Sequence, residues 1–398
     1  MKKTFNRELA SVIAIVSLAV MSMSVLQPVL SLYLDSINIE PAIIGLMFSV
    51  GMAGMVLGES SAGWLADKIG VKIPLGLGTI GCVPLVLGFA FTQNVPFIFT
   101  IFLLWGIVRA AVFSPGRGYI GVNVPTEQKA TFMAIYAASM SISRSLGNFV
   151  GGLVGDRLGY DWNFYIAAGI GLLGGGLVIF GLGKIPWGKP DLPIPTTTIG
   201  GEKPAKAPYR SRSFIAQCVI AAFSWASIGV IAPFLPLLVV DVAKVTATEV
   251  GILFTISALV TAALLIPMGR LSDRRNKKVM MIIGLLVTAA GIAGIALAKN
   301  FAGFTAAVVI ESIGIAIFSP AAVALLSETV PQNWQNTAMG IYGGCEDIGV
   351  VVGSALGGVV WSAIGPQSAF LLVGTVSSIL GAGVAFTLLK DKAIKTPA

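Results

Sequence analysis

Long apolar runs dominate this chain, and they constrain its fold more than any other feature. Charged and turn-forming residues divide the sequence into twelve such segments, each at least 20 residues long. A transmembrane helix needs roughly 20 mainly apolar residues, whereas transmembrane strands would alternate between apolar and polar residues. We therefore predict an all-α membrane protein with twelve transmembrane helices. The predicted spans are 9–34, 42–65, 73–92, 97–119, 131–154, 163–183, 213–240, 249–270, 279–298, 303–326, 337–361 and 367–389.

The basic residues are distributed unevenly between the two sides of these spans. With the N-terminus assigned to the cytoplasm, 21 of the 26 Lys and Arg residues fall on that side, and only Arg157, Lys244 and Lys299 fall outside. Basic residues concentrate in cytoplasmic loops, so both termini are expected to be cytoplasmic. Membrane orientation then explains the net charge of +8, and no nucleic-acid partner is expected. We expect a multi-pass protein of a prokaryotic inner or plasma membrane.

The chain contains no histidine. This excludes zinc sites of the usual kind, Ser-His-Asp hydrolysis and proton relays through imidazole. A P-loop lysine motif, which would bind nucleotide phosphates, is also missing from the sequence, so ATP hydrolysis is not expected. We expect no enzymatic activity, no metal and no cofactor. A proton gradient, with carboxylates as the proton carriers, is the expected source of energy.

One long polar stretch divides the chain nearly in half. It covers residues 184–212, is rich in proline and carries six basic residues. This composition is typical of a linker, and the orientation above places it in the cytoplasm. The sequence therefore predicts two six-helix bundles, 1–183 and 213–398, joined by this linker.

The two halves are repeats of one another. A single shift of 206 residues aligns identical residues over more than a hundred positions. Many secondary transporters are built from such repeats, which move against each other around a central site. The aligned pairs include Asp67/Asp273, Pro125/Pro331, Tyr136/Tyr342, Gly147/Gly353 and Gly151/Gly357.

The same loop pattern follows spans two and eight. The first copy, GWLADKIGVK, starts at Gly63, and the second, GRLSDRRNKK, starts at Gly269. Both resemble the loop signature Gly-x-x-x-Asp-[Arg/Lys]-x-Gly-[Arg/Lys]-[Arg/Lys] of the major facilitator superfamily. The resemblance implies two six-helix halves that transport by alternating access, with these loops as gating elements. The implied gating residues are Gly63, Asp67, Lys68, Gly269, Asp273 and Arg274.

Spans one and five are similar to the drug:proton antiporter branch of that superfamily. Span five contains SRSLGNFVGG, which is similar to the antiporter signature ending Gly-Pro-x-x-Gly-Gly, with Asn148 in place of the proline. Pro28, Tyr33 and Asp35 in span one also fit this branch. Glycines four residues apart permit close helix contact, so tight packing is at least as good an explanation for them. The expected helix-packing residues are Gly147, Gly151, Gly353 and Gly357.

Ionisable residues inside the apolar spans are the best indicators of a site. Each costs at least about 2.5–3.5 kcal/mol at mid-bilayer unless it faces protein or water. In the superfamily, spans 1, 4, 7 and 10 line a central cavity, which implies that Arg109 and Glu311 lie near the substrate. Gln27, Tyr136 and Tyr342 complete the predicted substrate-binding set.

The remaining ionisable residues lie in spans that flank the cavity in this superfamily. Glu346 and Asp347 are adjacent, and repulsion between neighbouring carboxylates favours proton uptake by one of them. Alternatively, the acids and arginines neutralise one another across helices, and for Asp347 and Arg144 both explanations stay open. The predicted proton-coupling residues are Glu311, Glu346, Asp347, Glu59 and Arg144.

Three functions are compatible with the sequence. The leading hypothesis is a monomeric exporter that exchanges small, amphipathic organic compounds for protons. The first alternative is an uptake symporter or uniporter for a small organic metabolite, which would be anionic if Arg109 and Arg144 bind it. The second is a membrane receptor that does not transport, because fold does not dictate function. Opposite movement of substrate and protons would distinguish antiport from symport.

Overall fold

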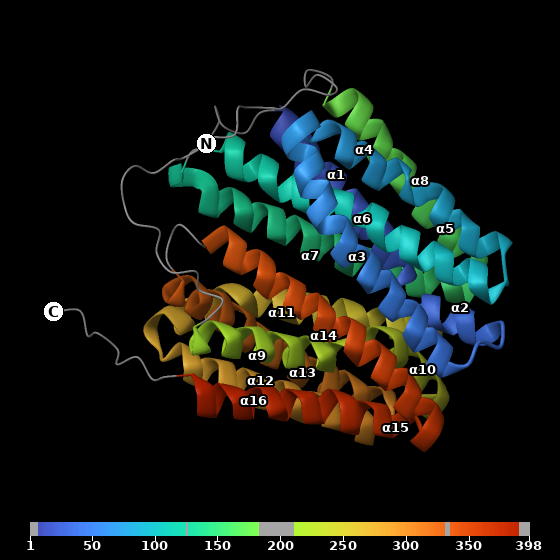
Figure 1. The fold of residues 1–398 in the computed structure, drawn as a ribbon. Helices are drawn as coiled ribbons and strands as arrows, with labels where there is room; N and C mark the ends of the chain where they lie inside the picture. Colours follow the sequence, from blue (N-terminus) through green and yellow to red (C-terminus); the bar gives the residue numbers. More distant parts are fainter. Residues whose placement is uncertain (1–6, 125, 183–210, 331–334, 390–398) are drawn as a thin grey trace. The chain divides into compact units, whose positions relative to one another are not determined.

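The computed structural model describes residues 7–124, 126–182, 211–330 and 335–389. Every regular element in these ranges is helical (Figure 1), which confirms the all-α prediction. The predicted linker, 184–212, lies outside the described residues apart from its last two positions.

Each predicted span corresponds to one helix or to helices that follow directly on one another. Eleven of the spans, counted over the described residues, are long and apolar enough to cross a membrane. The exception is α7, whose serine-rich middle carries Arg144. The first half contains α1 (Arg7–Leu26), α2 (Leu30–Ser36), α3 (Pro41–Ile69), α4 (Lys72–Ile80), α5 (Cys82–Phe91), α6 (Val95–Asn123), α7 (Thr126–Arg157) and α8 (Tyr160–Gly181). The second half contains α9 (Arg212–Gly229), α10 (Ile231–Ala243), α11 (Ala247–Arg274), α12 (Lys277–Leu297), α13 (Phe301–Thr329), α14 (Gln335–Ile364), α15 (Pro366–Ser368), the π-helix η3 (Ala369–Thr375) and α16 (Val376–Leu388).

Proline explains why the first span of each half is broken into two helices. Pro28 lies between α1 and α2, and Pro233 lies in the first turn of α10, shortly after α9 ends at Gly229. A proline lacks the N–H that an internal helical hydrogen bond requires, and its ring clashes with the preceding turn. The two prolines are 205 residues apart, so each half has a proline at nearly the same place in its first span, close to the break.

The chain divides into two compact units, which are described separately below. Each unit takes most of its residues from one half of the chain, with two exceptions. The first turns of α3 belong to unit 2, and the first turns of α11 belong to unit 1. Unit 1 consists of Met1–Ile39, Val50–Thr198 and Thr246–Thr255, and unit 2 consists of Glu40–Ser49, Ile199–Val245 and Ile256–Ala398.

Hydrogen bonds account for both exceptions. Within unit 2, the Ser49 hydroxyl in α3 donates to the carbonyl of Val351 in α14, at 2.8 Å. Within unit 1, the Thr255 hydroxyl in α11 donates to the carbonyl of Ser145 in α7, at 3.1 Å. Each segment therefore packs with the unit to which it is assigned.

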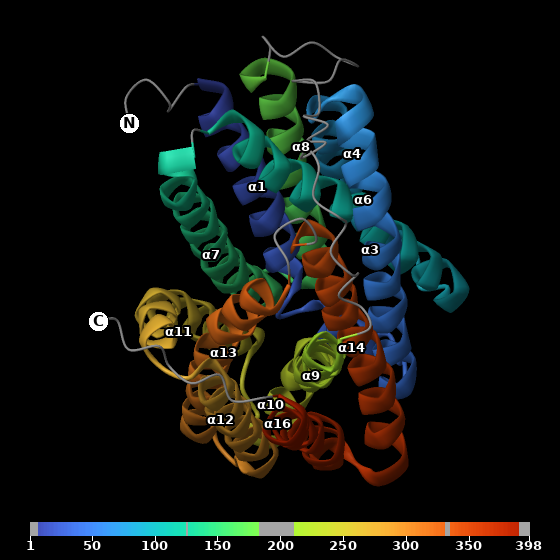
Figure 2. The same cartoon turned by 60° about the vertical axis from the view of Figure 1, so that its left-hand side comes forward.

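The core of unit 1 forms around α1, which packs against both α7 and α8 (Figure 2). Asn163 of α8 is fully buried, and its Nδ2 donates to the carbonyls of Val25 at 3.2 Å and Gly151 at 2.7 Å. These carbonyls belong to α1 and α7. A single amide side chain therefore joins three helices.

Replacing Asn163 with alanine should lower the stability of unit 1. The carbonyls of Val25 and Gly151 lose this donor, and each lost hydrogen bond costs on the order of 1 kcal/mol. The measurement is the midpoint of thermal unfolding in detergent. Ser378→Ala is the control, because Ser378 is buried in unit 2 and its hydroxyl has no hydrogen-bond partner among the described residues. Equal midpoints for the two variants would contradict this role of Asn163.

The core of unit 2 repeats the core of unit 1. Both clusters contain buried residues at positions that the 206-residue shift relates. The repeat in the sequence is therefore also a repeat in packing. The related core pairs are Leu75/Met281, Val112/Phe318, Ile120/Leu326, Val124/Val330, Phe132/Ala338 and Tyr136/Tyr342.

Glycines allow α7 to lie directly against α1 in unit 1. A Cβ at Gly147 would come 2.6 Å from the carbonyl oxygen of Met21, and a Cβ at Gly151 would overlap the carbonyl oxygen of Val25. Both obstacles are backbone atoms, which cannot rotate away. The absence of a side chain at these two positions therefore permits the close approach of the helices.

The contact between α14 and α9 in unit 2 is equivalent (Figure 2). A Cβ at Gly353 would overlap the carbonyl oxygen of Ala226, and a Cβ at Gly357 would come 2.8 Å from the ring of Phe234 in α10. The four glycines that the sequence suggested for helix packing therefore all occupy positions where a side chain would collide with a neighbouring helix.

Candidate functional site

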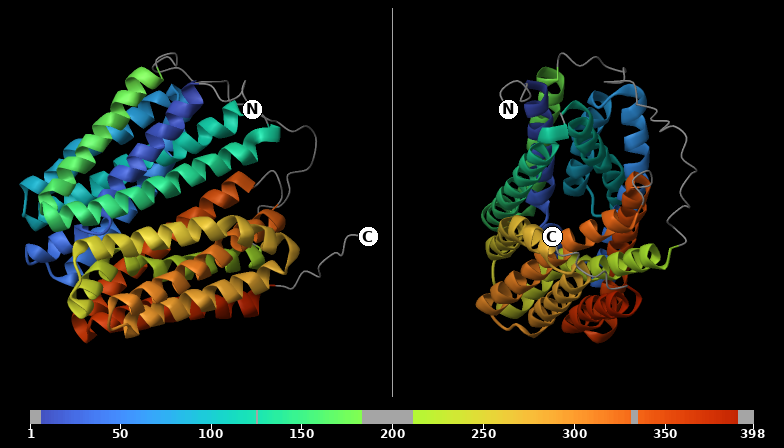
Figure 3. Two further views of the ribbon diagram at one scale, coloured as in Figure 1. Left: turned by 180° about the vertical axis from the view of Figure 1, so that it is seen from behind. Right: turned by 90° about the vertical axis from the view of Figure 1, so that its left-hand side faces the viewer.

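Among the predicted site residues whose side chains the structure describes, Glu311 is the most enclosed acid. It lies in the middle of α13, with 4% of its surface exposed. The neighbouring helices α12 and α13 run side by side as a hairpin (Figure 3). A Cβ at Gly291 of α12 would come 2.6 Å from the Cα of Glu311. Because Gly291 has no side chain, the backbone of α12 lies directly against the backbone of α13 at Glu311.

Two hydroxyl groups connect this acid to α11. The Oγ of Ser312 lies 3.2 Å from Oε2 of Glu311 and 2.8 Å from the Oγ of Ser257 in α11. Ser312 is fully buried. No described residue forms an ion pair with Glu311. Among the described residues, a neutral hydroxyl rather than a cation is therefore the polar partner of the carboxylate.

Arg109 is held in unit 1 by polarizable partners. Its Nη2 lies 3.0 Å from the sulfur of Met52 in α3, and its Cζ lies 5.2 Å from the centre of the Trp105 ring. A cation over the face of an indole is attracted by the quadrupole of the ring. These contacts place Arg109 between α3 and α6, where the guanidinium is half-buried.

The other predicted proton-coupling residues are less enclosed than Glu311. Glu346 and Asp347 are half-buried in α14 of unit 2, and Glu59 is half-buried in α3 of unit 1. Arg144 is exposed on α7. Because an enclosed charge is costlier than an exposed one, burial distinguishes Glu311 from the other predicted acids.

The two predicted substrate-binding tyrosines lie in the apolar cores. Tyr136 of α7 and Tyr342 of α14 are each 3% exposed and belong to the core clusters of units 1 and 2, respectively. Gln27 is half-buried in the break between α1 and α2. The structure thus gives the two tyrosines equivalent packing positions, in agreement with the repeat.

The two motif loops differ in the turn that follows the helix. After α3 ends at Ile69, Gly70 has a φ of +78°, a conformation that favours glycine. The equivalent residue after α11 is Asn276, with a φ of −65°. Its side chain accepts hydrogen bonds from the N–H groups of Lys278 and Val279 and so caps α12. A helix cap in place of a left-handed turn explains why the second copy has no glycine here.

The predicted gating side chains are exposed where the structure describes them. Lys68 lies over the ring of Trp64, 4.0 Å from its centre, at the end of α3. Gly269, Asp273 and Arg274 lie in the last turns of α11, and the side chains of the latter two are exposed. The side chains at two further predicted positions lie outside the described residues: Gly63 and Asp67.

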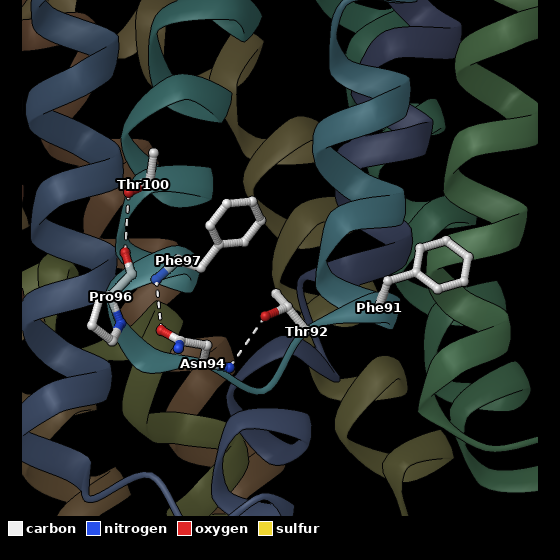
Figure 4. A pocket seen from close by; sticks show the side chains of 6 residues that line it. All are labelled: Phe91, Thr92, Asn94, Pro96, Phe97 and Thr100. Carbon is white, nitrogen blue, oxygen red and sulfur yellow. Dashed lines mark hydrogen bonds between the residues drawn. The ribbon is translucent and has the colours of Figure 1, made fainter.

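An open pocket of about 520 Å³ lies at the connection between α5 and α6 in unit 1 (Figure 4). Asn94 shapes this connection: its N–H donates to Oγ1 of Thr92 at 3.2 Å, and its Oδ1 accepts from the N–H of Phe97 at 3.4 Å. None of the lining residues is ionisable, and none is a predicted site residue, so the pocket offers no group for proton exchange. The lining residues are Phe91, Thr92, Asn94, Pro96, Phe97 and Thr100.

The fold and the buried groups define a class of protein. Helices long and apolar enough to cross a bilayer form two units with equivalent cores, and one unit encloses an acid. This combination defines a multi-pass membrane protein with a polar group in its interior. The family model of the Major Facilitator Superfamily matches residues 12–222 and 214–398. The chain belongs to this superfamily and is a membrane transporter rather than an enzyme.

Relatives from several organisms match much of the chain at low identity. An uncharacterized MFS-type transporter of Methanocaldococcus jannaschii is 22% identical over 354 residues, which cover 89% of this chain and 91% of the relative. The multidrug resistance protein MdtH of Cronobacter sakazakii is 27% identical over 348 residues, covering 85% of this chain and 82% of MdtH. The multi-drug resistance efflux pump PmrA of Streptococcus pneumoniae is 30% identical over 154 residues, 38% of each chain.

Solved structures confirm the predicted fold of two six-helix halves. The nucleoside transporter NupG has a TM-score of 0.82 at 15% identity, covering 97% of this chain and 100% of NupG. A bacterial homologue of the human lysosomal transporter Spinster has a TM-score of 0.74 at 14% identity, covering 95% of each chain. At these identities, the likeness concerns the fold.

Sequence reasoning missed the two serines that contact each other beside Glu311. Serine is common in membrane helices, so neither Ser257 nor Ser312 attracts notice alone. The available signal was the repeat, because the equivalent positions in the first half, 206 residues earlier, are Gly51 and Gly106. A position-by-position comparison of the halves would have found two hydroxyls in place of two glycines.

Proposed function

We propose that this transporter exports small, amphipathic organic compounds in exchange for protons, by alternating access of its two halves. The observation that carries the proposal is the enclosure of Glu311 in unit 2, where the acid has one hydroxyl partner but no ion pair with a described residue. The names of two relatives, the multidrug proteins MdtH and PmrA, support export of such compounds.

An acid without a cationic partner inside a membrane helix is suited to carry a proton. Its charged form costs at least about 2.5–3.5 kcal/mol at the bilayer centre, and proton binding removes that charge. If the acid becomes accessible to the two sides of the membrane in turn, each cycle can exchange a proton for a substrate. We assign this role first to Glu311. The flanking candidates for the same role are Glu346, Asp347 and Glu59, and Arg144 would take part in proton coupling as a permanent charge that pairs with one of these acids.

Substrate binding is assigned to Arg109 and Gln27, together with Glu311. The guanidinium of Arg109 is half-buried beside Trp105, so part of the cation stays available to a polar group of the substrate. The loops that follow α3 and α11 are assigned to gating through Asp67 and Asp273. These roles are the ones that the superfamily resemblance implies for the matching positions of this chain.

We also infer the topology and the assembly. Both termini are assigned to the cytoplasm of a prokaryotic cell, because 21 of the 26 basic residues then lie on the cytoplasmic side. The protein is assigned to the plasma membrane as a monomer, since the two halves of one chain supply both repeats. A cysteine-accessibility measurement at Lys68 and Lys299, each replaced by cysteine, tests the orientation: only the latter should react from outside the cell.

A thermal-shift screen identifies the charge class of the substrate. Ethidium, uridine and benzoate serve as cationic, neutral and anionic probes, applied to the wild type and to Arg109→Ala. A ligand present at 100 times its Kd stabilises the folded state by about 2.7 kcal/mol. We expect ethidium to raise the midpoint of unfolding of the wild type. Stabilisation by benzoate alone, lost in Arg109→Ala, would indicate an anionic metabolite instead.

Proteoliposomes that contain a trapped pH-sensitive dye then test the direction of coupling. The probe that stabilises the protein is added outside, and its entry should drive protons out, so the internal pH should rise. A fall in internal pH during uptake would indicate symport, and uptake with no pH change would indicate uniport. Binding without any movement of the probe would support the receptor hypothesis.

A further inference from the structure

The contact between Ser257 and Ser312 occupies the place of a glycine contact in the other half. In unit 1, a Cβ at Gly106 of α6 would overlap the carbonyl oxygen of Gly51 in α3, so the backbones of these helices touch at this point. Under the 206-residue shift, the positions equivalent to Gly51 and Gly106 are Ser257 and Ser312. In unit 2, the two hydroxyl oxygens lie 2.8 Å apart. The second half therefore has a polar contact at the position where the first half has a close backbone contact.

Beside an ionised carboxylate, the two hydroxyl protons can satisfy both contacts in only one order. Ser312 has one hydroxyl proton but two acceptors within reach, Oε2 of Glu311 at 3.2 Å and Oγ of Ser257 at 2.8 Å. An ionised carboxylate only accepts hydrogen bonds. Ser312 then donates to Glu311, and Ser257 donates to Ser312.

A protonated Glu311 reverses this order. Its carboxyl group can donate to Ser312, and the proton of Ser312 is then free to bond Ser257. Ser257 changes from donor to acceptor, although no side chain has to leave its place. Consecutive hydrogen bonds polarise one another, so the protonation state of Glu311 affects the hydrogen bond of the Ser257 hydroxyl.

Ser257 lies on α11, a helix that contributes residues to both units. Residues 246–255, with the first turns of α11, belong to unit 1, whereas the remainder of α11 belongs to unit 2. Ser257 lies two residues after that boundary. The Ser257 hydroxyl is therefore close to the point where α11 passes from unit 1 to unit 2.

We propose that Ser312 and Ser257 form a hydroxyl relay that transmits the protonation state of Glu311 to α11, with Ser257 as a positioning residue. The proposal rests on the proposed role of Glu311 as a proton carrier. Three uncharged groups connect this acid to its neighbours: Gly291 of α12 packs against its backbone, Ser312 of α13 lies within hydrogen-bond distance of its carboxylate, and Ser257 of α11 follows through Ser312. The relay is accordingly the polar connection from Glu311 to a neighbouring helix.

Infrared difference spectroscopy of the full chain in lipid nanodiscs, recorded between acidic and alkaline pH, tests the relay without a substrate. A protonated carboxyl group gives a C=O stretching band, and its position rises in wavenumber when hydrogen bonding weakens. We expect Glu311→Gln to remove one component of this band. Ser312→Ala should move that component to higher wavenumber, and Ser257→Ala should move it in the same direction by a smaller amount.

Three further variants separate the relay from a general disturbance of packing. Ser257→Thr keeps the hydroxyl and should leave the band at the wild-type position. Ser257→Gly copies the residue of the first half and should behave like Ser257→Ala. Ser354→Ala removes another buried hydroxyl of unit 2, which donates to the carbonyl of Gly229 at 2.7 Å, and should leave the band unmoved.

Different results contradict the relay and the proton-carrying role of Glu311. If Glu311→Gln removes the component but both Ser257→Ala and Ser257→Gly leave it at the wild-type position, the relay is wrong and Glu311 still exchanges a proton. If Glu311→Gln leaves the band intact, Glu311 does not take up a proton over this pH range. That outcome would overturn both the relay and the coupling role of Glu311.

Discussion

Replacing Gly353 with alanine should lower the free energy of unfolding by about 1–3 kcal/mol, because overpacking a close contact forces the helices to shift. The added methyl group would overlap the carbonyl oxygen of Ala226. That oxygen belongs to the backbone of α9, so the clash can be relieved only if α9 and α14 move apart. Thermal unfolding in detergent should show a lower midpoint. Gly151→Ala should have the same effect in unit 1, through the carbonyl of Val25.

Gly344→Ala provides the matched control on the same helix. A Cβ at Gly344 would have no atom within 4 Å among its described neighbours. Alanine is about 1 kcal/mol more favourable than glycine inside a helix, so this variant should unfold at or above the wild-type midpoint. If Gly353→Ala and Gly344→Ala unfolded at the same temperature, close contact between α9 and α14 would not be needed for stability.

Replacing Glu311 with glutamine should abolish transport driven by a pH gradient. Glutamine has nearly the same shape as glutamate and can still accept a hydrogen bond from Ser312, but it cannot bind and release a proton. Pumping against a gradient should therefore fall to the level of protein-free liposomes. Exchange of labelled for unlabelled substrate requires no net proton movement, so it should fall only by the share of substrate binding that the charge of Glu311 supplies.

Both activities can be measured in the same proteoliposomes, with and without an imposed pH gradient. Glu328→Gln is the control, because Glu328 lies near the end of the same helix and pairs with Lys277 at 2.8 Å, with 45% of its side chain exposed. This variant should retain gradient-driven transport. If Glu311→Gln also retained it, the coupling role would pass to Glu346 or Asp347.

The positions of the helices could be predicted from the sequence because a membrane span must be apolar over its whole length. The predicted span 73–92, for example, corresponds to helices α4 and α5, which together cover 72–91. The break between α4 and α5 at Gly81 was not predicted. Glycine is frequent in membrane helices, and the sequence does not distinguish a glycine that interrupts a helix from one that packs within it.

The candidate site could be predicted only in part. Glu311 and Arg109 are conspicuous in the sequence, because a charge inside an apolar run is costly and therefore rare. Ser257 and Ser312 carry no such signal. They matter because α11 and α13 bring their hydroxyl oxygens within 2.8 Å, although the two residues are 55 positions apart in the chain.

The sequence by itself determined the all-α membrane class, the places of the helices, the duplication and the resemblance to the superfamily. These properties follow from local composition and from spacing along the chain. Only the tertiary structure decided that Gly291 lies against the backbone of Glu311, that a hydroxyl contact leads to Ser257, and that Tyr136 and Tyr342 pack in the cores. Burial and hydrogen bonding depend on which faces of distant helices meet, and in an almost uniformly apolar helix the sequence marks those faces only weakly.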